Sequence, residues 1–245
     1  MTGPRVALRC SAVLGVALAG CTGGPHGLAD EIVEAPGATG VGFGDPRRAI
    51  DGVRGAGEHA GSLDVYSLDY RERTHLVLGF SGEVVIDGPG ADLVVFENGF
   101  RQQGVDAFFM DPVVVEVSPD GARWLAFPHD YVAVDETLYE PHPEAWRGFA
   151  GVTPVRFDSE RDADAFAEGA GGDAFDLAEL VGTDDASRAL AAEIRDAGAR
   201  YVRLTSAALV VNPDTGVAFP RDAVSDGADI DGVAARLLVQ RDGAR

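Results

Sequence analysis

Three acidic side chains occupy positions where a metal ion could bind. In the predicted strand Asp92–Glu97, Glu97 falls on the same face as apolar residues, because side chains alternate between the two faces of a strand. Asp229 and Asp231 share a face on either side of Ile230. A carboxylate among apolar neighbours is costly unless it meets donors or a cation, and calcium takes about 6–8 oxygen ligands. The predicted calcium ligands are Glu97, Asn98, Asp229 and Asp231.

Two readings of these acids stay open. Asp and Asn side chains commonly accept hydrogen bonds from backbone amides in turns, which would explain the same residues without a metal. The calcium interpretation requires that the acids meet in space.

A second candidate site consists of aromatic residues in or next to a long irregular segment. Residues 135–172 are rich in Pro, Gly and acidic residues and are predicted to form a long loop, and long loops are often functional. Aromatic rings on such loops can stack on sugar faces. The predicted ligand-binding residues are Tyr131, Tyr139 and Trp146. Their alternative role is to cover the apolar surface of the domain.

Catalytic motifs are not apparent. The five histidines show no metal-ligand spacing, and the chain has no Gly-x-Ser-x-Gly elbow, P-loop or dinucleotide fingerprint. We therefore expect a protein that is not an enzyme.

The elements that must position these residues are mostly short strands. Runs rich in β-branched residues alternate with Gly, Pro and Asp turn signals, which is typical of an antiparallel sandwich. The predicted strands are Ser62–Leu68, Thr74–Phe80, Asp92–Glu97, Val113–Ser118, Trp124–Phe127, Tyr201–Thr205 and Val233–Gln240. Residues Pro119-Asp120-Gly121 predict a tight hairpin turn.

One helix is expected among the late strands. Ala186–Ala197 is rich in helix formers, with Asp184 or Asp185 as its N-cap and Gly198 after its end. Leu190, Ile194 and Ala197 are predicted to pack on the sandwich. A shorter helical turn is predicted at Asp176–Leu180.

The N-terminus has the form of an export signal. Arg5 and Arg9 flank an apolar run that is too short to span a bilayer. Leu18-Ala19-Gly20-Cys21 resembles the lipobox of bacterial lipoproteins, in which the cysteine is lipidated and anchors the protein to a membrane. By the same resemblance, Thr22 implies the outer membrane or cell surface. The predicted organisation is a signal peptide at 1–20, a lipidated Cys21 with a flexible tether to 40, and one β-sandwich at 41–245.

Composition restricts the partners. The formal net charge is −20 and the chain contains no lysine, so we expect no binding to nucleic acid or anionic headgroups. Cys10 and Cys21 are the two cysteines, and Cys10 leaves with the signal peptide. No disulfide remains possible once Cys21 is lipidated, so the core must stabilise the domain.

Four ordered stretches resemble discoidin-like (factor 5/8 C-type) galactose-binding jelly rolls. They are Ala49–Gly52, similar to Ala-x-Asp-Gly; Val115–Trp124, similar to "EVSxDGxxW"; Arg200–Leu204, similar to "RYVRL"; and Ala234–Val239 in place of the closing strand. This resemblance implies a jelly-roll β-sandwich. The family's calcium site near Asp51 uses a glutamate in the closing strand, where this chain has Arg236. That departure puts an inherited site in doubt.

Longer motifs resemble a group of bacterial cell-surface proteins and lipoproteins. These motifs are Asp87–Phe100 ("DGPGxDxxVFENGF"), Gly171–Gly182 ("GGDxFDLAxxG" with one extra residue) and Asp229–Val233 ("DxDxV"). The resemblance implies a β-sandwich at the cell surface.

Together these features predict a membrane-anchored lipoprotein with a non-catalytic binding sandwich. The expected ligand is a surface glycan or a protein. The alternatives are a structural or accessory subunit of a surface complex, or a secreted hydrolase that uses paired carboxylates.

Overall fold

The computed structural model of the chain describes residues 27–72 and 74–240. The predicted signal peptide at 1–20 and the predicted lipidation at Cys21 lie outside these residues. In the described part, no helix is long and apolar enough to cross a membrane.

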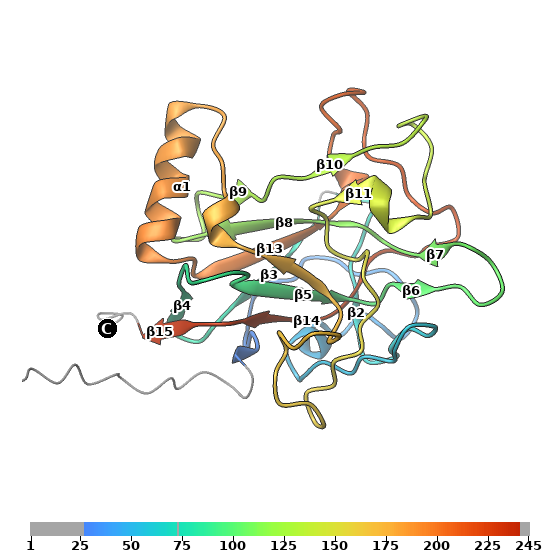
Figure 1. Cartoon of the computed structure of the whole chain (residues 1–245), viewed down its shortest axis with the longest axis horizontal. Helices are drawn as coiled ribbons and strands as arrows, with labels where there is room; N and C mark the ends of the chain where they lie inside the picture. The colour runs from blue at the N-terminus through green and yellow to red at the C-terminus, as the bar shows by residue number, and fades with distance from the viewer. Residues whose placement is uncertain (1–26, 73, 241–245) are drawn as a thin grey trace, which may run out of the picture.

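The fold is an antiparallel β-sandwich with one α-helix, as the sequence predicts (Figure 1). One sheet has the order β1 (Glu31–Glu34), β3 (Leu76–Gly79), β13 (Tyr201–Ser206), β8 (Val113–Ser118) and β9 (Leu125–Ala126). The other has the order β12 (Asp173–Phe175), β5 (Leu93–Glu97), β14 (Asp229–Ala235) and β2 (Tyr66–Ser67).

Shorter elements complete the fold. Three two-stranded pairs join β4 (Glu83–Val85) to β15 (Leu238–Gln240), β6 (Phe100–Arg101) to β7 (Phe108–Phe109), and β10 (Asp130–Tyr131) to β11 (Trp146–Arg147). The 3-10 turns are η2 (Pro46–Ala49), η3 (Pro143–Ala145), η4 (Leu177–Glu179) and η5 (Ala207–Leu209). The turn η4 confirms the helical turn predicted at Asp176–Leu180.

The main core lies between the two large sheets. In β13, Val202 and Leu204 are buried in this core, whereas Tyr201 and Arg203 face the other way, as alternation predicts. The same core contains alternate residues of β3 and β8 from the first sheet and of β5 from the second, together with Ile230, Val233 and Ala235 of β14. Burying each such Leu or Val stabilises the fold by roughly 1.5–3 kcal/mol.

Strand β5 is buried on both faces. Leu93 and Val95 face the main core, while Val94 and Phe96 belong to a second apolar cluster with Phe157. The rings of Phe96 and Phe157 stack at 5.4 Å. Part of the long irregular segment thus covers the outer face of the second sheet.

The predicted hairpin is confirmed. Strand β8 pairs with β9, with Glu116 opposite Ala126. In the turn, one oxygen of Asp120 accepts hydrogen bonds from the amides of Ala122 and Arg123 at 2.9 Å each.

Helix α1 (Asp185–Ala197) begins one residue before the predicted start. Asp184 and Ser187 form a capping box, and Gly198 (φ +87°) ends the helix. Leu190 and Ile194 are buried as predicted, together with Ala191. Ala197 is exposed, contrary to the prediction, because it lies in the last turn, where the chain leaves the helix.

Two predicted segments differ in the structure. Part of the tether predicted at 21–40 belongs to the sandwich, because β1 pairs with β3 and Leu28 bridges to Ala234. The segment predicted as one closing strand, Val233–Gln240, divides between β14 and β15, which lie in different sheets. Between them Arg236 donates its main-chain N–H to the Asp92 carbonyl at 2.8 Å.

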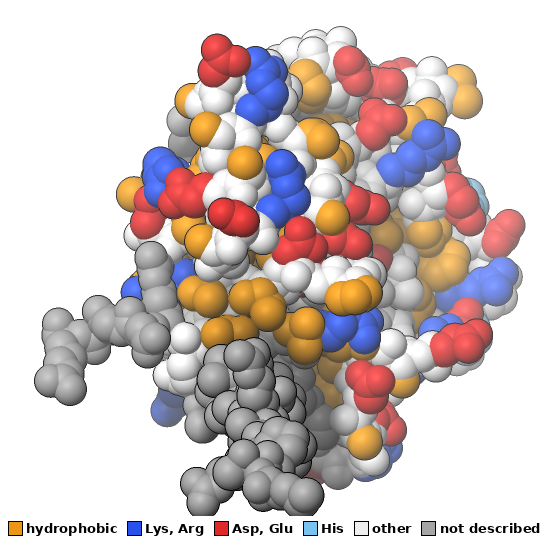
Figure 2. Space-filling view, turned by 60° about the vertical axis from the view of Figure 1, so that its left-hand side comes forward, with side chains coloured by type: hydrophobic (Ala, Val, Ile, Leu, Met, Phe, Trp, Pro, Cys, Tyr) orange, Lys and Arg blue, Asp and Glu red, His pale blue; other side chains and the backbone are white. Residues whose placement is uncertain are grey.

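Charge is mixed over the surface shown in Figure 2, where acidic and basic side chains lie side by side. Arg123, for example, contacts both Asp120 and Glu193. The acidic excess is therefore not gathered into one patch on this face.

Candidate functional site

The Glu97 carboxylate is buried at the end of β5. Only 2% of the surface of Glu97 is exposed to solvent. The oxygen Oε1 accepts a hydrogen bond from the main-chain N–H of Asp229 at 3.0 Å. The main-chain N–H of Asn98 donates to the Asp229 carbonyl at 3.1 Å. Oε2 is buried and has no hydrogen-bond partner among the described residues. A buried carboxylate oxygen without a donor is costly, so this atom needs a physical explanation.

Two glycines keep side chains away from Oε2. A Cβ added to Gly151 would lie 3.0 Å from this oxygen and 2.7 Å from the Asp111 carbonyl oxygen. A Cβ added to Gly99 would lie 3.6 Å from Oε2 and 3.0 Å from the Gly151 carbonyl oxygen. Each of these built positions thus has both Oε2 and a main-chain carbonyl oxygen beside it, and a side chain at either glycine would crowd them.

Further carboxylates surround Glu97. Burial raises the pKa of Glu97 well above its ordinary value, and the negative charges of Asp111, Asp229 and Asp173 raise it further. Burial also raises the pKa of Asp111 to about 7, although a hydrogen bond from Ser225 opposes the shift. The pKa of Asp229 is raised by burial as well. The arrangement therefore disfavours several ionised acids in one place unless a cation compensates them.

An open pocket of about 370 Å³ lies beside these acids. Asp111, Asp226 and Asp229 contribute its carboxylates, and the other lining residues are Gly40, Val41, Phe43, Ser67, Phe109, Val224 and Gly227. The lining thus combines acceptors with aromatic and aliphatic surface. None of these lining residues is basic.

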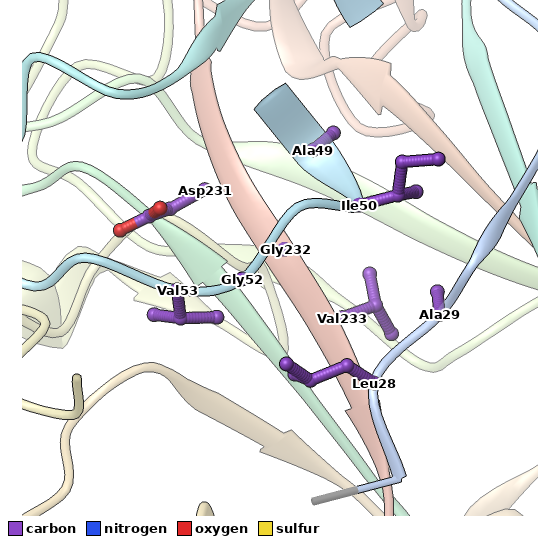
Figure 3. A pocket seen from close by; sticks show the side chains of 9 residues that line it. All are labelled: Leu28, Ala29, Ala49, Ile50, Gly52, Val53, Asp231, Gly232 and Val233. Atoms are coloured by element: carbon purple, nitrogen blue, oxygen red, sulfur yellow. The ribbon is translucent and has the colours of Figure 1, made fainter. Parts of the chain in front are cut away.

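Asp231 lies apart from Glu97. Both of its oxygens accept a hydrogen bond from the Arg54 amide at 3.0 Å. Figure 3 shows its side chain on the Val53 side of β14, away from Val233. A register shift in the β14–β5 pairing falls between Ile230 and Gly232, so simple alternation fails at this residue.

Burial raises the pKa of Asp231 to about 7, and the charges that act on it are those of Asp64, Arg54 and Asp51. These are different groups from the ones around Glu97. The structure therefore brings Glu97, Asn98 and Asp229 together but places Asp231 elsewhere, where it accepts a backbone amide.

The side-chain carboxamide of Asn98 holds the neighbouring loop at Ser62. Its Oδ1 accepts from the Ser62 amide, and its Nδ2 donates to the Ser62 carbonyl at 3.0 Å. Asn98 lies beside the acids, but both polar ends of its side chain already have main-chain partners.

The residues of the predicted aromatic site form a small apolar core of their own, separate from the main core and from the cluster around Phe157. Tyr131 and Trp146 are each 1% exposed and pack with Phe149 and Phe219, and Tyr139 packs against them. The Trp146 indole donates to the Glu140 carbonyl at 2.8 Å, and the Tyr139 hydroxyl donates to the Met110 carbonyl at 2.9 Å. Because the rings are covered, they are not free to stack on a ligand in this conformation, and the alternative role of covering the sandwich matches their burial.

Sequence reasoning missed a second acidic cluster. The carboxylate oxygens of Asp87, Asp92 and Asp176 lie within 4.8 Å of one another. However, Asp92 accepts from the amides of Gly88 (2.9 Å) and Leu177 (2.8 Å), and Asp176 caps η4. These bonds join the "DGPG" turn to the segment after β12, so Asp92 and Asp176 hold structure.

Asp111 and Gly151 are the other residues that sequence reasoning missed. The available signal for Asp111 was an acid between Met110 and Pro112 at the start of an apolar strand. Gly151 carried no distinguishing signal among the many glycines of the chain.

No family model matches the chain, and searches of curated proteins and of solved structures gave no match either.

Proposed function

We propose that this chain is an exported lipoprotein, acylated at Cys21 and held at the outer membrane or cell surface, whose sandwich is a non-catalytic binding domain. Its ligand, a surface glycan, enters the pocket between Phe43, Phe109 and the acids Asp226 and Asp229. The observation that carries the binding role is this combination of carboxylate acceptors and aromatic surface in one open pocket.

The chemistry of the pocket suits a sugar. Carboxylates accept hydrogen bonds from hydroxyl groups, and aromatic rings pack on the apolar face of a pyranose. Its volume of about 370 Å³ falls within the usual range for small-ligand sites, about 300–1,000 Å³. The location differs from the aromatic site expected from the sequence, because those aromatic rings are buried.

A glycan array on residues 22–245 tests the proposal. Asp226→Asn and Phe109→Ala should abolish or strongly reduce any binding, because both remove pocket groups. Leu138→Ala is the matched control, since Leu138 is 63% exposed and does not line the pocket. Binding that survives both pocket variants, or no binding to any glycan, would contradict the assignment.

A secreted hydrolase is the second candidate, and one observation favours it. Asp111 has its pKa raised to about 7 by burial and shares the pocket with a second carboxyl, that of Asp226, so Asp111 could serve as the proton donor of a carboxyl pair. Release of reducing ends from any glycan bound on the array, abolished by Asp111→Asn, would support the hydrolase over the binding domain.

A further inference from the structure

The described part of the chain begins beside one end of strand β14. Leu28 forms a β-bridge to Ala234, and Gly27 lies so close to the Ala235 carbonyl that no side chain would fit there. The chain therefore enters the sandwich next to the last residues of β14, shortly before β15. A lipid attached upstream of Gly27 is consequently tied to this end of the molecule.

The distance from the proposed lipid anchor to this end is short. Six residue steps separate Cys21 from Gly27, and a chain spans at most about 3.6 Å per residue, or about 22 Å in all. A globular domain of this size has a diameter of about 40 Å. The far end of the sandwich therefore cannot turn onto the membrane surface while the lipid on Cys21 stays inserted.

The end beside the chain entry carries an apolar face. Strands β4 and β15 pair antiparallel there, and the main-chain N–H of Ile86 donates to the Leu237 carbonyl at 3.2 Å. Leu238 faces the main core, so alternation turns Leu237 and Val239 outward, where they are 38% and 45% exposed. Figure 2 brings this end of the molecule forward and shows a band of hydrophobic side chains on it. Contiguous apolar surface of this kind marks interaction sites.

The β4–β15 ribbon also lacks the exposed acids that are common elsewhere in the chain. Residues 236–240 contain no acid, in a protein of net charge −20. In β4, Glu83 is only 4% exposed. The next acid, Asp87, places a carboxylate oxygen within 4.8 Å of those of Asp92 and Asp176. The ribbon therefore presents apolar side chains, rather than negative charge that phosphate headgroups would repel.

We propose that the ribbon face bearing Ile86, Leu237 and Val239 rests on the lipid surface of the membrane that holds the Cys21 anchor. This inference rests on the proposed acylation of Cys21. A short tether keeps the ribbon at an effective concentration of about millimolar near the bilayer, so a weak apolar contact is enough to hold it there. A few aliphatic side chains at the interface supply such a contact, although they would not bind a membrane without the anchor.

The open pocket lies at the opposite end of the sandwich. Asp229, which lines it, is the first residue of β14, whereas Ala235, beside the chain entry, is the last. Seven strand residues span about 20 Å. Figure 1 shows β15 at one end of the molecule and β7, which carries the pocket residue Phe109, at the other. With the ribbon face on the bilayer, the pocket is held on the side far from the membrane, and its ligand arrives from that side.

Fluorescence quenching by nitroxide-labelled lipid tests this orientation. The mature lipoprotein is reconstituted into phosphatidylcholine vesicles with a fluorophore on a single introduced thiol, Val239→Cys or, as the matched control, Val224→Cys. Both valines are exposed, at 45% and 79%, and Val224 lines the pocket at the far end. The nitroxide lipid should remove most of the fluorescence at position 239 and little at position 224. Equal quenching at the two positions, or stronger quenching at 224, would overturn the proposal and leave the lipoprotein assignment intact.

A second substitution tests the apolar contact itself. Leu237→Asp should reduce the quenching at position 239, because a charge on the ribbon face opposes its burial in the interface. Leu138→Asp, at another exposed position, should leave that quenching unchanged. Full quenching in Leu237→Asp would show that the tether alone brings this end close. A chain that does not float with the vesicles at all would overturn the acylation of Cys21 and this inference with it. None of these readouts depends on a ligand in the pocket.

Discussion

The Asp173 carboxylate accepts a hydrogen bond from the Gly151 amide at 2.7 Å. The same oxygen, Oδ2, accepts from the Val152 amide at 3.0 Å. These bonds fix the turn whose carbonyl lies near Glu97. A residue of the "GGDxFDLA" motif therefore positions a segment that is distant in sequence, which gives this motif a physical role.

Asp173→Asn should change how stability depends on pH. Burial raises the pKa of Asp173 from 3.8 to about 6, so the folded state binds its proton more tightly than the unfolded state does. This group therefore stabilises the protein at low pH, and its contribution is lost as pH rises from about 4 to about 6. At about 1.4 kcal/mol per pKa unit, the change is on the order of 3 kcal/mol.

Urea unfolding at several pH values measures this effect. Asparagine can keep the amide hydrogen bonds through its own oxygen, but it does not titrate. The difference in unfolding free energy between wild type and variant should therefore slope between about pH 4 and 6 and be flat above. A difference that is constant with pH would show that Asp173 has an ordinary pKa.

Gly151→Ala should destabilise the protein more than a comparable glycine substitution. Gly151 has φ +86°, and its added Cβ would lie 2.7 Å from the Asp111 carbonyl oxygen. Gly82 also has φ +86° but has open space around the built Cβ, so Gly82→Ala isolates the backbone strain. That strain costs roughly 1–2 kcal/mol. Chemical denaturation should show a larger loss for Gly151→Ala, and equal losses would mean that the close approach to Asp111 is relieved cheaply.

Trp146→Ala should lower the stability of the folded protein. The side chain is buried against Tyr131, with ring centroids 4.1 Å apart, and against Phe149. Truncation of such a core aromatic costs about 3–5 kcal/mol. The melting temperature should fall sharply, whereas the exposed Leu138→Ala should change it little. A folded, fully stable Trp146→Ala variant that loses only ligand binding would instead support the aromatic site expected from the sequence.

Cys21→Ser should release the protein from membranes. The expectation comes from Leu18-Ala19-Gly20-Cys21 after an Arg-flanked apolar run, and acyl chains on this cysteine would supply the proposed membrane anchor. Detergent-phase partitioning should move the variant to the aqueous phase. A variant that still partitions with detergent would place the anchor elsewhere.

Strand alternation predicted much of the fold because β-branched residues dominate its strands. The range Val113–Ser118 is the same in the prediction and in β8, and the two faces of Tyr201–Thr205 are as predicted. Alternation failed at Asp231, because the pairing register shifts there. It also missed β1, whose four residues follow a Gly- and Pro-rich stretch and are held by pairing with β3.

The candidate site was only partly predictable, because strand patterns do not show which residues from distant parts of the sequence come together. Glu97 and Asp229 lie on neighbouring strands of one sheet, so their strand patterns could bring them together. Asp111 precedes β8 of the opposite sheet and lines the same pocket as Asp229, and no local pattern encodes that proximity. The burial of Tyr131 and Trp146 likewise depends on Phe219, which is more than 70 residues away in sequence.

Asp92→Asn should loosen the contact between the "DGPG" turn and the segment after β12. Each oxygen of Asp92 accepts one amide hydrogen bond, from Gly88 and from Leu177, and the residue is fully buried. An asparagine can accept only one of the two, and its amide group then faces the other N–H donor. Leaving that buried donor without an acceptor costs about 1–3 kcal/mol.

Asp87→Asn carries the same change of charge at a partly exposed position of the same cluster and should cost less than about 0.5 kcal/mol. Unfolding free energies from urea titration separate the two variants, and hydrogen exchange at the Gly88 and Leu177 amides should speed up in Asp92→Asn alone. If both variants were equally stable, the carboxylate would contribute by charge rather than by its two hydrogen bonds.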